Sequence, residues 1–142
     1  MENITVENLR CLIVDDSSTM RQIIKDILAP LKITSPVFAE NGKVAYEKLQ
    51  SNITNKRPQF HVVFLDWAMP EMDGYTLLKL CREDINYNNV AFIMVTAENE
   101  KALVMMAIKT GATSFIRKPF TANEFNEKLL KVVNWLEERN VV

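Results

Sequence analysis

The sequence predicts a doubly wound α/β fold in which helices cover both faces of a five-stranded parallel sheet. Strand-like and helix-like segments alternate five times along the 142 residues, which is the order typical of parallel α/β domains. Three of the strand-like segments are unbroken apolar runs, as expected for strands buried on both faces. The length is that of one domain. We expect a single domain over residues 1–142, with its core at about residues 9–139 and no separate output domain.

Prolines and apolar spacing set the limits of the first elements. Apolar side chains three and four residues apart follow residues 11–14 and predict a helix that ends near Ala29, before Pro30. Residues 37–39 follow Pro36, and because proline cannot donate to a sheet ladder, we expect this strand at the edge of the sheet. The predicted strands are residues 11–14, 37–39, 61–65, 90–95 and 114–117.

The helices are predicted from apolar stripes of helical spacing. The second is expected at residues 42–50 and the fourth at residues 100–110, where Gly111 ends it. The stripe of the third places Cys81 in the core. The predicted stripes are Met20, Ile23, Ile24, Ile27, Leu28 and Leu31 in the first helix, Leu77, Leu78, Cys81 and Ile85 in the third, and Phe125, Leu129, Val132, Val133 and Leu136 in the last.

The composition excludes several classes of protein. Lys and Arg number 17 and Asp and Glu 18, for a net charge of −1, without the basic excess of a nucleic-acid-binding protein. The first residues lack a basic and apolar leader, and no apolar run reaches the ~18 residues of a membrane span. We therefore expect a cytoplasmic protein with no membrane partner. Cys11 and Cys81 fall in apolar stretches, which predicts two buried thiols rather than a disulfide.

Polar side chains end four of the five predicted strands. Asp15 and Asp16 end the first, Asp66 the third, Thr96 the fourth and Lys118 the fifth. Ligands of open α/β sheets bind outside the carboxyl ends of the strands, so we expect these side chains to meet in one crevice. Three carboxylates there need a cation, and oxygen ligands with room for water suit Mg²⁺. A carboxylate beside a metal, a lysine and a hydroxyl can accept a phosphoryl group.

The stretches around these residues resemble the motifs of the receiver domains of two-component response regulators. The similar stretches are Val14–Arg21, Asp66–Gly74, Thr96–Ala97 and Lys118–Phe120. They occur in the order of that family, and the resemblance extends over residues 9–139. The stand-alone chemotaxis regulators of the family look most similar. The resemblance implies a flavodoxin-like (βα)5 sandwich with strand order 2-1-3-4-5, which agrees with the edge position inferred from Pro36.

The resemblance also implies a role for each residue of the crevice. Asp66 resembles the phosphoacceptor, and Lys118 resembles the lysine that pairs with the phosphoryl oxygens and precedes a peptide bond that is usually cis. Thr96 resembles the hydroxyl that bonds the phosphoryl group. The groups that resemble the ligands of Mg²⁺ are Asp15, Asp16, Asp66 and the backbone carbonyl of Ala68.

Two residues depart from the pattern of the chemotaxis regulators. Thr96 and Phe115 occupy the two positions that move on activation, but those regulators have a tyrosine where Phe115 stands, so the hydroxyl is missing here. They have an asparagine where Ala68 stands. A methyl group cannot orient a hydrolytic water, so we expect a phosphoryl lifetime different from theirs.

The fourth predicted helix is unusually apolar. Residues 102–108 are seven apolar residues in a row, which extend all the way round a helix. A helix lying on a sheet buries one side, so part of this surface is exposed unless a partner covers it. The predicted partner face, on the fourth helix, fifth strand and fifth helix, consists of Val104, Ile108, Phe115 and Trp135; the alternative is a lightly packed surface.

The expected function is that of a stand-alone response regulator, which is a phosphoacceptor and not an enzyme acting on other substrates. A histidine kinase is the expected phosphodonor, and a protein such as the flagellar motor switch is the expected target of a monomer. A phosphatase partner and a phosphorylated dimer are left open. One alternative is a receiver that shuttles or stores phosphoryl groups. Another is a phosphohydrolase with an aspartyl nucleophile, but such enzymes carry a second Asp where Ala68 stands.

Overall fold

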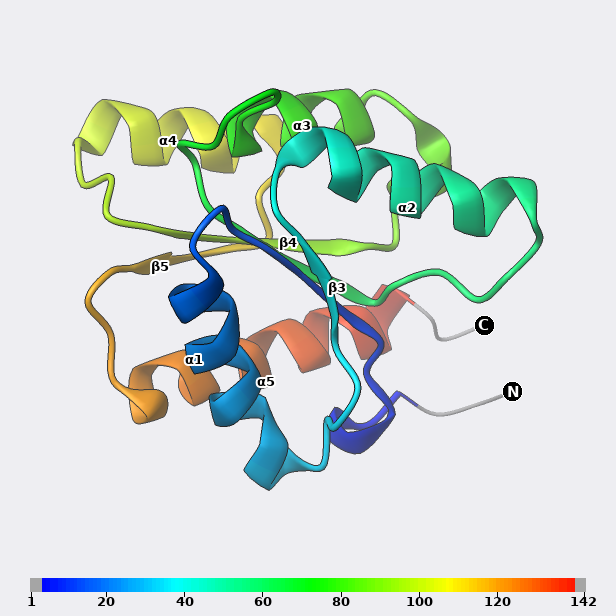
Figure 1. Ribbon diagram of the computed structural model, residues 1–142, viewed down its shortest axis with the longest axis horizontal. Helices are drawn as coiled ribbons and strands as arrows, with labels where there is room; N and C mark the ends of the chain where they lie inside the picture. The colour runs from blue at the N-terminus through cyan, green and yellow to red at the C-terminus, as the bar shows by residue number, and fades with distance from the viewer. Residues whose placement is uncertain (1–3, 140–142) are drawn as a thin grey trace.

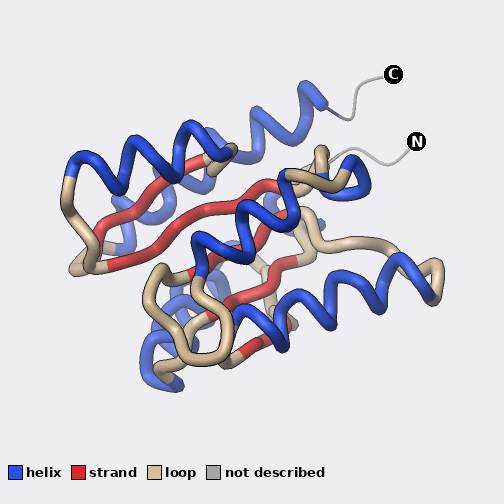
Figure 2. Tube along the Cα trace, turned by 90° about the horizontal axis from the view of Figure 1, so that it is seen from above, coloured by secondary structure: helices blue, strands red, loops and turns tan. Residues whose placement is uncertain are grey.

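The computed structural model describes residues 4–139 and has the predicted three-layer architecture. Five parallel strands lie in the order β2-β1-β3-β4-β5, which confirms the predicted topology and the edge position of the strand after Pro36. Figure 2 shows helices above and below the strands. The strands are β1 (Cys11–Val14), β2 (Val37–Ala39), β3 (Val62–Leu65), β4 (Ala91–Thr96) and β5 (Ser114–Arg117).

Two helices cover one face of the sheet and three cover the other (Figure 1). Alternate side chains of each strand point to opposite faces, so Cys11 and Ile13 of β1 pack under α1 and α5, while Leu12 and Val14 pack under α2, α3 and α4. The helices are α1 (Ser18–Leu28), α2 (Gly42–Thr54), α3 (Gly74–Arg82), α4 (Lys101–Thr110) and α5 (Ala122–Arg139), with short 3-10 helices at Val6–Asn8 (η1), Ala29–Leu31 (η2) and Ile85–Tyr87 (η3). No helix within residues 4–139 combines the length and apolar character needed to cross a bilayer.

The core is close to the predicted one. Every residue of the predicted stripe of α5 is buried, and Cys11 and Cys81 are buried free thiols. Burial in apolar surroundings raises the pKa of each of these thiols to about 12. Both therefore stay protonated and poorly nucleophilic at neutral pH.

Three predicted details were wrong. The second helix extends to Thr54 rather than residue 50, because residues 51–54 continue its backbone ladder. Ile85 is 82% exposed, since α3 ends at Arg82 and Asp84 caps a separate 3-10 turn that buries Tyr87 instead. Ile23 of the first stripe is also exposed, because the sheet covers only a narrow strip of α1.

A half-buried arginine that sequence patterns did not single out joins several elements on the face of the sheet that α2, α3 and α4 cover. The Arg82 guanidinium donates to the backbone carbonyls of Gly111, Tyr87 and Val90 at 2.7–2.9 Å and lies 4.8 Å from the ring centre of Phe92. Burial lowers the pKa of Arg82 to about 10, so the side chain is charged at neutral pH. Gly111 has φ 122°, and a Cβ there would press on the Arg82 stem, so the end of α4 is fixed against α3.

Candidate functional site

The five predicted residues lie at the carboxyl edge of the sheet, where an acidic cluster and two ion pairs bring four of the side chains together. The parallel register pairs Val14 of β1 with Leu65 of β3, so Asp15 and Asp66, the next residues, leave neighbouring strands at the same level. Thr96 is the last residue of β4, and Lys118 directly follows β5. The backbone N–H of Lys118 donates to the Thr96 carbonyl at 2.8 Å, which keeps the ends of these two strands together.

The ammonium group of Lys118 bridges two of the carboxylates. Its Nζ lies 2.8 Å from Asp15 Oδ2 and 3.1 Å from Asp66 Oδ2, and these are the ion pairs found among the described residues. Burial by itself lowers the pKa of Lys118, but hydrogen bonds and charge from Asp15 and Asp66 outweigh it, so the pKa is raised overall. The side chain is therefore a permanent cation at neutral pH, and its stabilising contribution is lost only above the ordinary lysine range.

The three carboxylates form an oxygen-rich cluster that fits Mg²⁺. One ligand atom from each of Asp15, Asp16 and Asp66 lies within 4.8 Å of the others. Asp15 is buried, Asp66 is half-buried and Asp16 is exposed, so one side of the cluster is open to water. Mg²⁺ prefers one or two carboxylates together with water and phosphate oxygens. These three residues would hold the ion; binding by the carbonyl of Ala68 stays a prediction.

Hydrogen bonds hold both carboxylate oxygens and the backbone carbonyl of Asp15. The backbone N–H of Ser17 donates to its Oδ1 at 2.9 Å, while Oδ2 is bound by Lys118. Arg21, one turn into α1, donates from Nη1 to the Asp15 carbonyl at 2.6 Å. Ser17 also caps α1 through the N–H of Met20. Sequence patterns predicted no role for Ser17 or Arg21; the available signal was that both closely follow the acidic pair.

The loop after β3 folds tightly around the phosphoacceptor candidate. The backbone N–H of Trp67 donates to Asp66 Oδ1 at 2.7 Å, and Gly74 N–H donates to the Trp67 carbonyl at 2.8 Å. A Cβ on Gly74 would collide with the carbonyl oxygen of Asp66, so glycine is required for this approach. Ala68, in the same loop, is exposed. The loop therefore has no polar side chain two residues beyond Asp66.

The two predicted switch residues lie on adjacent strands next to the site. Thr96 is 3% exposed, and its Oγ1 accepts from the Glu98 N–H at 3.2 Å. Phe115 pairs with Met94, two residues before Thr96 on β4, and is half-buried against the core on the α4 side. The Lys118–Pro119 peptide bond is cis, as the resemblance implied.

The structure brings together three of the four residues of the predicted partner face. Val104, Ile108 and Phe115 line one hollow of about 680 Å³ between α4, β5 and α5. Trp135 lies instead in a second hollow near the end of α4, where the Arg139 guanidinium covers its indole at 4.4 Å. We therefore define the α4–β5–α5 face by Val104, Ile108 and Phe115 alone.

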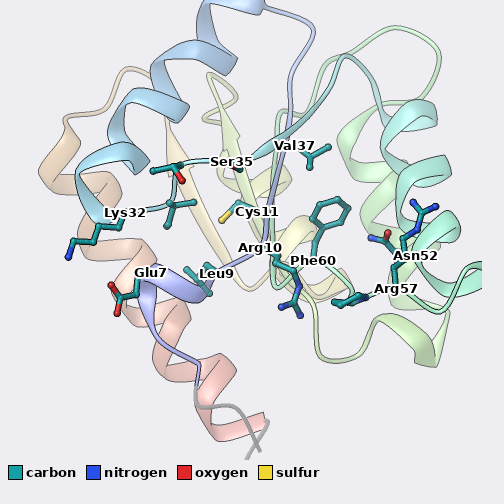
Figure 3. Close-up of a pocket in the computed structure, with 13 residues that line it drawn as sticks. Glu7, Leu9, Arg10, Cys11, Lys32, Ser35, Val37, Asn52, Arg57 and Phe60 are labelled. Carbon is teal, nitrogen blue, oxygen red and sulfur yellow. The ribbon is translucent and has the colours of Figure 1, made fainter.

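A further hollow lies at the opposite end of the sheet, away from the acidic cluster. Its volume is about 510 Å³, and its lining includes Arg10, Cys11 and Phe60. Figure 3 shows Lys32 and Glu7 on one side of these residues and Asn52 and Arg57 on the other. None of the predicted site residues lines it.

Comparison with known proteins agrees with this geometry. Residues 11–130 match the family described as response regulator receiver domain. The chain belongs to this receiver family. It is 44% identical over 121 residues to the chemotaxis protein CheY1 of Helicobacter pylori, covering 85% of this chain and 94% of that protein. It is 39% identical to CheY-3 of Vibrio cholerae over 132 residues, or 93% and 97% of the two chains.

Solved receiver structures have the same fold. The CheY chain from Borrelia burgdorferi, solved in a complex with CheX, BeF3 and Mg²⁺, superposes with a TM-score of 0.77 at 29% identity. The alignment covers 87% of this receiver and 88% of that chain. CheY4 of Vibrio cholerae superposes with a TM-score of 0.74 at 28% identity, covering 87% and 98% of the two chains.

Replacing Lys118 by methionine is expected to make the stability of the receiver depend strongly on Mg²⁺. Without the ammonium group, Asp15 stays buried beside Asp66 with no cation, which costs about 3 kcal/mol of unfolding free energy. Added Mg²⁺ supplies positive charge to the same oxygens and restores most of this loss. Thermal unfolding with Mg²⁺ and with EDTA measures the effect, and Lys79→Met, an exposed lysine of α3, is the matched control. Equal Mg²⁺ dependence in the two variants would contradict the prediction.

Proposed function

We propose that this receiver is a phosphorylation-controlled switch in chemotaxis. Asp66 accepts a phosphoryl group from a histidine kinase, and the α4–β5–α5 face then changes its affinity for a protein target. The observation that carries the proposal is the Lys118 ammonium between Asp15 and Asp66, beside a third carboxylate. This arrangement offers a nucleophile together with the positive charge that phosphoryl transfer requires.

The transfer step follows from the chemistry of the two partners. A carboxylate oxygen of Asp66 attacks the phosphorus atom of a phosphohistidine, the P–O bond forms as the P–N bond breaks, and the released imidazole nitrogen takes a proton from solvent. Bound Mg²⁺ would supply positive charge to the phosphoryl oxygens and the attacking carboxylate. Lys118 already lies against Asp66 Oδ2, so it can neutralise a phosphoryl oxygen with little reorganisation. Thr96 offers a hydroxyl from the neighbouring strand end.

The proposed output is a displacement of Thr96 and Phe115 that alters the α4–β5–α5 face. The Thr96 hydroxyl accepts only one hydrogen bond, from a loop N–H, so it is able to turn and donate to a phosphoryl oxygen. Phe115 is half-buried and lines the hollow beside Val104. An inward movement of its ring into space left by Thr96 would reshape this hollow. A target that binds one conformation of this face a few kcal/mol more tightly than the other then responds to phosphorylation.

The chemotaxis assignment and its target come from the relatives. Chemotaxis CheY proteins match this chain at 39–44% identity over most of its length, which supports a role in chemotaxis. Beyond these names, we propose the flagellar motor switch as the target and a phosphatase as a further partner, as the family resemblance implies.

The receiver is expected to become phosphorylated on Asp66 when it is incubated with acetyl phosphate and Mg²⁺. Intact mass spectrometry should show a phosphoryl adduct that hydroxylamine removes, as expected of an acyl phosphate. Asp66→Asn keeps the size of the side chain but removes the nucleophile, so it should give no adduct. An adduct of equal yield in this variant would refute the proposal, and so would an adduct of equal yield in EDTA.

Replacing Ala68 by asparagine is expected to shorten the lifetime of the phosphorylated state. Ala68 is exposed two residues beyond Asp66, and an amide at that place can orient the attacking water where a methyl group cannot. We expect hydrolysis to be roughly tenfold faster. The rate is measured as loss of the phosphoryl adduct after the donor is removed, with Ala68→Val as a control for size. An unchanged rate in Ala68→Asn would remove the idea.

Replacing Val104 by glutamate is expected to weaken target binding while phosphorylation is kept. A carboxylate on the rim of the hollow would be desolvated by an apolar partner, at a cost of about 2 kcal/mol, or roughly thirtyfold in affinity. Affinity for the flagellar motor switch protein is compared with and without beryllofluoride and Mg²⁺. Met105→Glu, an exposed change on another side of α4, is the control. Loss of both binding and phosphorylation would indicate misfolding instead.

A further inference from the structure

An aromatic pair joins the loop after the phosphoacceptor to helix α3. The rings of Trp67 and Tyr75 stack with their centres 5.2 Å apart and their planes inclined by 14°. Both residues are half-buried, and Trp67 packs against the core on the face covered by α2, α3 and α4. Stacking of this kind fixes the relative orientation of two rings as well as burying their faces. A displacement of the Trp67 ring therefore moves the Tyr75 ring that stacks on it.

The hydroxyl of Tyr75 extends this contact to helix α4. The Thr110 hydroxyl donates to the Tyr75 hydroxyl at 3.0 Å, across 35 residues of sequence. Thr110 is the last residue of α4, and at about 100° per residue it lies on the side of the helix opposite Ile108. The helix is thus held on one side by Thr110 and lines the proposed target-binding hollow on the other with Val104 and Ile108.

The other end of this chain of contacts is sensitive to the chemical state of Asp66. The Trp67 N–H donates to Asp66 Oδ1 at 2.7 Å, which is a hydrogen bond to a full carboxylate. Forming an acyl phosphate converts the carboxylate into an ester-like group whose oxygens are weaker acceptors. The hydrogen bond that fixes the Trp67 backbone therefore weakens in the phosphorylated state and is strong in the free state.

We propose that Tyr75 is a positioning residue that couples the Trp67 segment to the last turn of α4. Its ring follows the indole next to Asp66, and its hydroxyl transmits the change to Thr110. This inference rests on the proposed phosphorylation of Asp66 and adds a connection through α3 to the one through Thr96 and Phe115. Helix α4 is then the element that the Asp66 site and the target site both bias, which is the requirement for coupling between two sites.

The test uses beryllofluoride with Mg²⁺ and backbone amide NMR of the full chain. In the unmodified protein, the ligand should shift the amides of Asp66 and Lys118 as well as those of the last turn of α4. Tyr75→Phe keeps the ring and removes the hydroxyl, so the shifts at Asp66 and Lys118 should remain while those at the end of α4 fall by about half or more. Thr110→Val should have the same effect, and the double variant should be no worse than either single one.

Tyr46→Phe is the matched control, because Tyr46 accepts a hydrogen bond from Gln50 within α2 and has no link to Thr110. This variant should leave the shifts at the end of α4 unchanged even if it lowers the unfolding temperature as much as Tyr75→Phe does. Unreduced shifts at the end of α4 in Tyr75→Phe, or additive losses in the double variant, would overturn the proposal. Absence of shifts at Asp66 in the unmodified protein would instead overturn the proposed function, and this inference with it.

Discussion

The rest of the structure depends on one electrostatic constraint, which is that the carboxylates at the carboxyl edge of the sheet cannot lie together without a cation. Lys118 meets this constraint by binding Asp15 and Asp66 at once. The three residues come from the ends of β1, β3 and β5, so the ion pairs fix the relative height of strands that are not all neighbours. Any group that enters the crevice, whether Mg²⁺ or a phosphoryl group, competes with these contacts. The two contacts of Lys118 are therefore the ones that binding in the crevice would exchange.

The surroundings of the ion pairs limit which parts can rearrange. Asp15 is held by Ser17, Arg21 and Lys118, and it forms the rigid side of the site. The opposite side is looser, because Ala68 is exposed and the hydroxyl of Thr96 accepts a hydrogen bond from the next loop. In the proposed switch, changes at Asp66 would therefore be directed toward β4, β5 and α4 rather than toward α1. This asymmetry has a local origin, since the N-terminus of α1 begins directly at the acidic pair.

The sequence predicted the sheet, its order and the meeting of the five strand-end residues, because these depend on periodicity, on Pro36 and on the topology of parallel strands. It could not predict that Ile85 is exposed and Tyr87 buried, since a single helical turn after Arg82 is set by the Asp84 cap rather than by an apolar pattern. The separation of Trp135 from the hollow of Val104 was equally hidden. Trp135 lies on α5 and Val104 on α4, and both helices border β5. The packing of Arg139 on the Trp135 indole shows that this ring faces away from the hollow.

Helix α4 shows why the seven apolar residues in a row are compatible with a well-packed receiver. Of these, Ala107 alone is fully buried, so the helix contributes little to the core for its apolar content. Its C-terminal end is held by polar contacts instead: Arg82 donates to the carbonyl of Gly111, and Tyr75 accepts from the hydroxyl of Thr110. A helix held by a few polar contacts and a thin apolar contact shifts at lower free-energy cost than one anchored in the core. Its exposed apolar surface, including Met105, Met106 and Ile108, is the surface that the proposed switch would present to a protein partner.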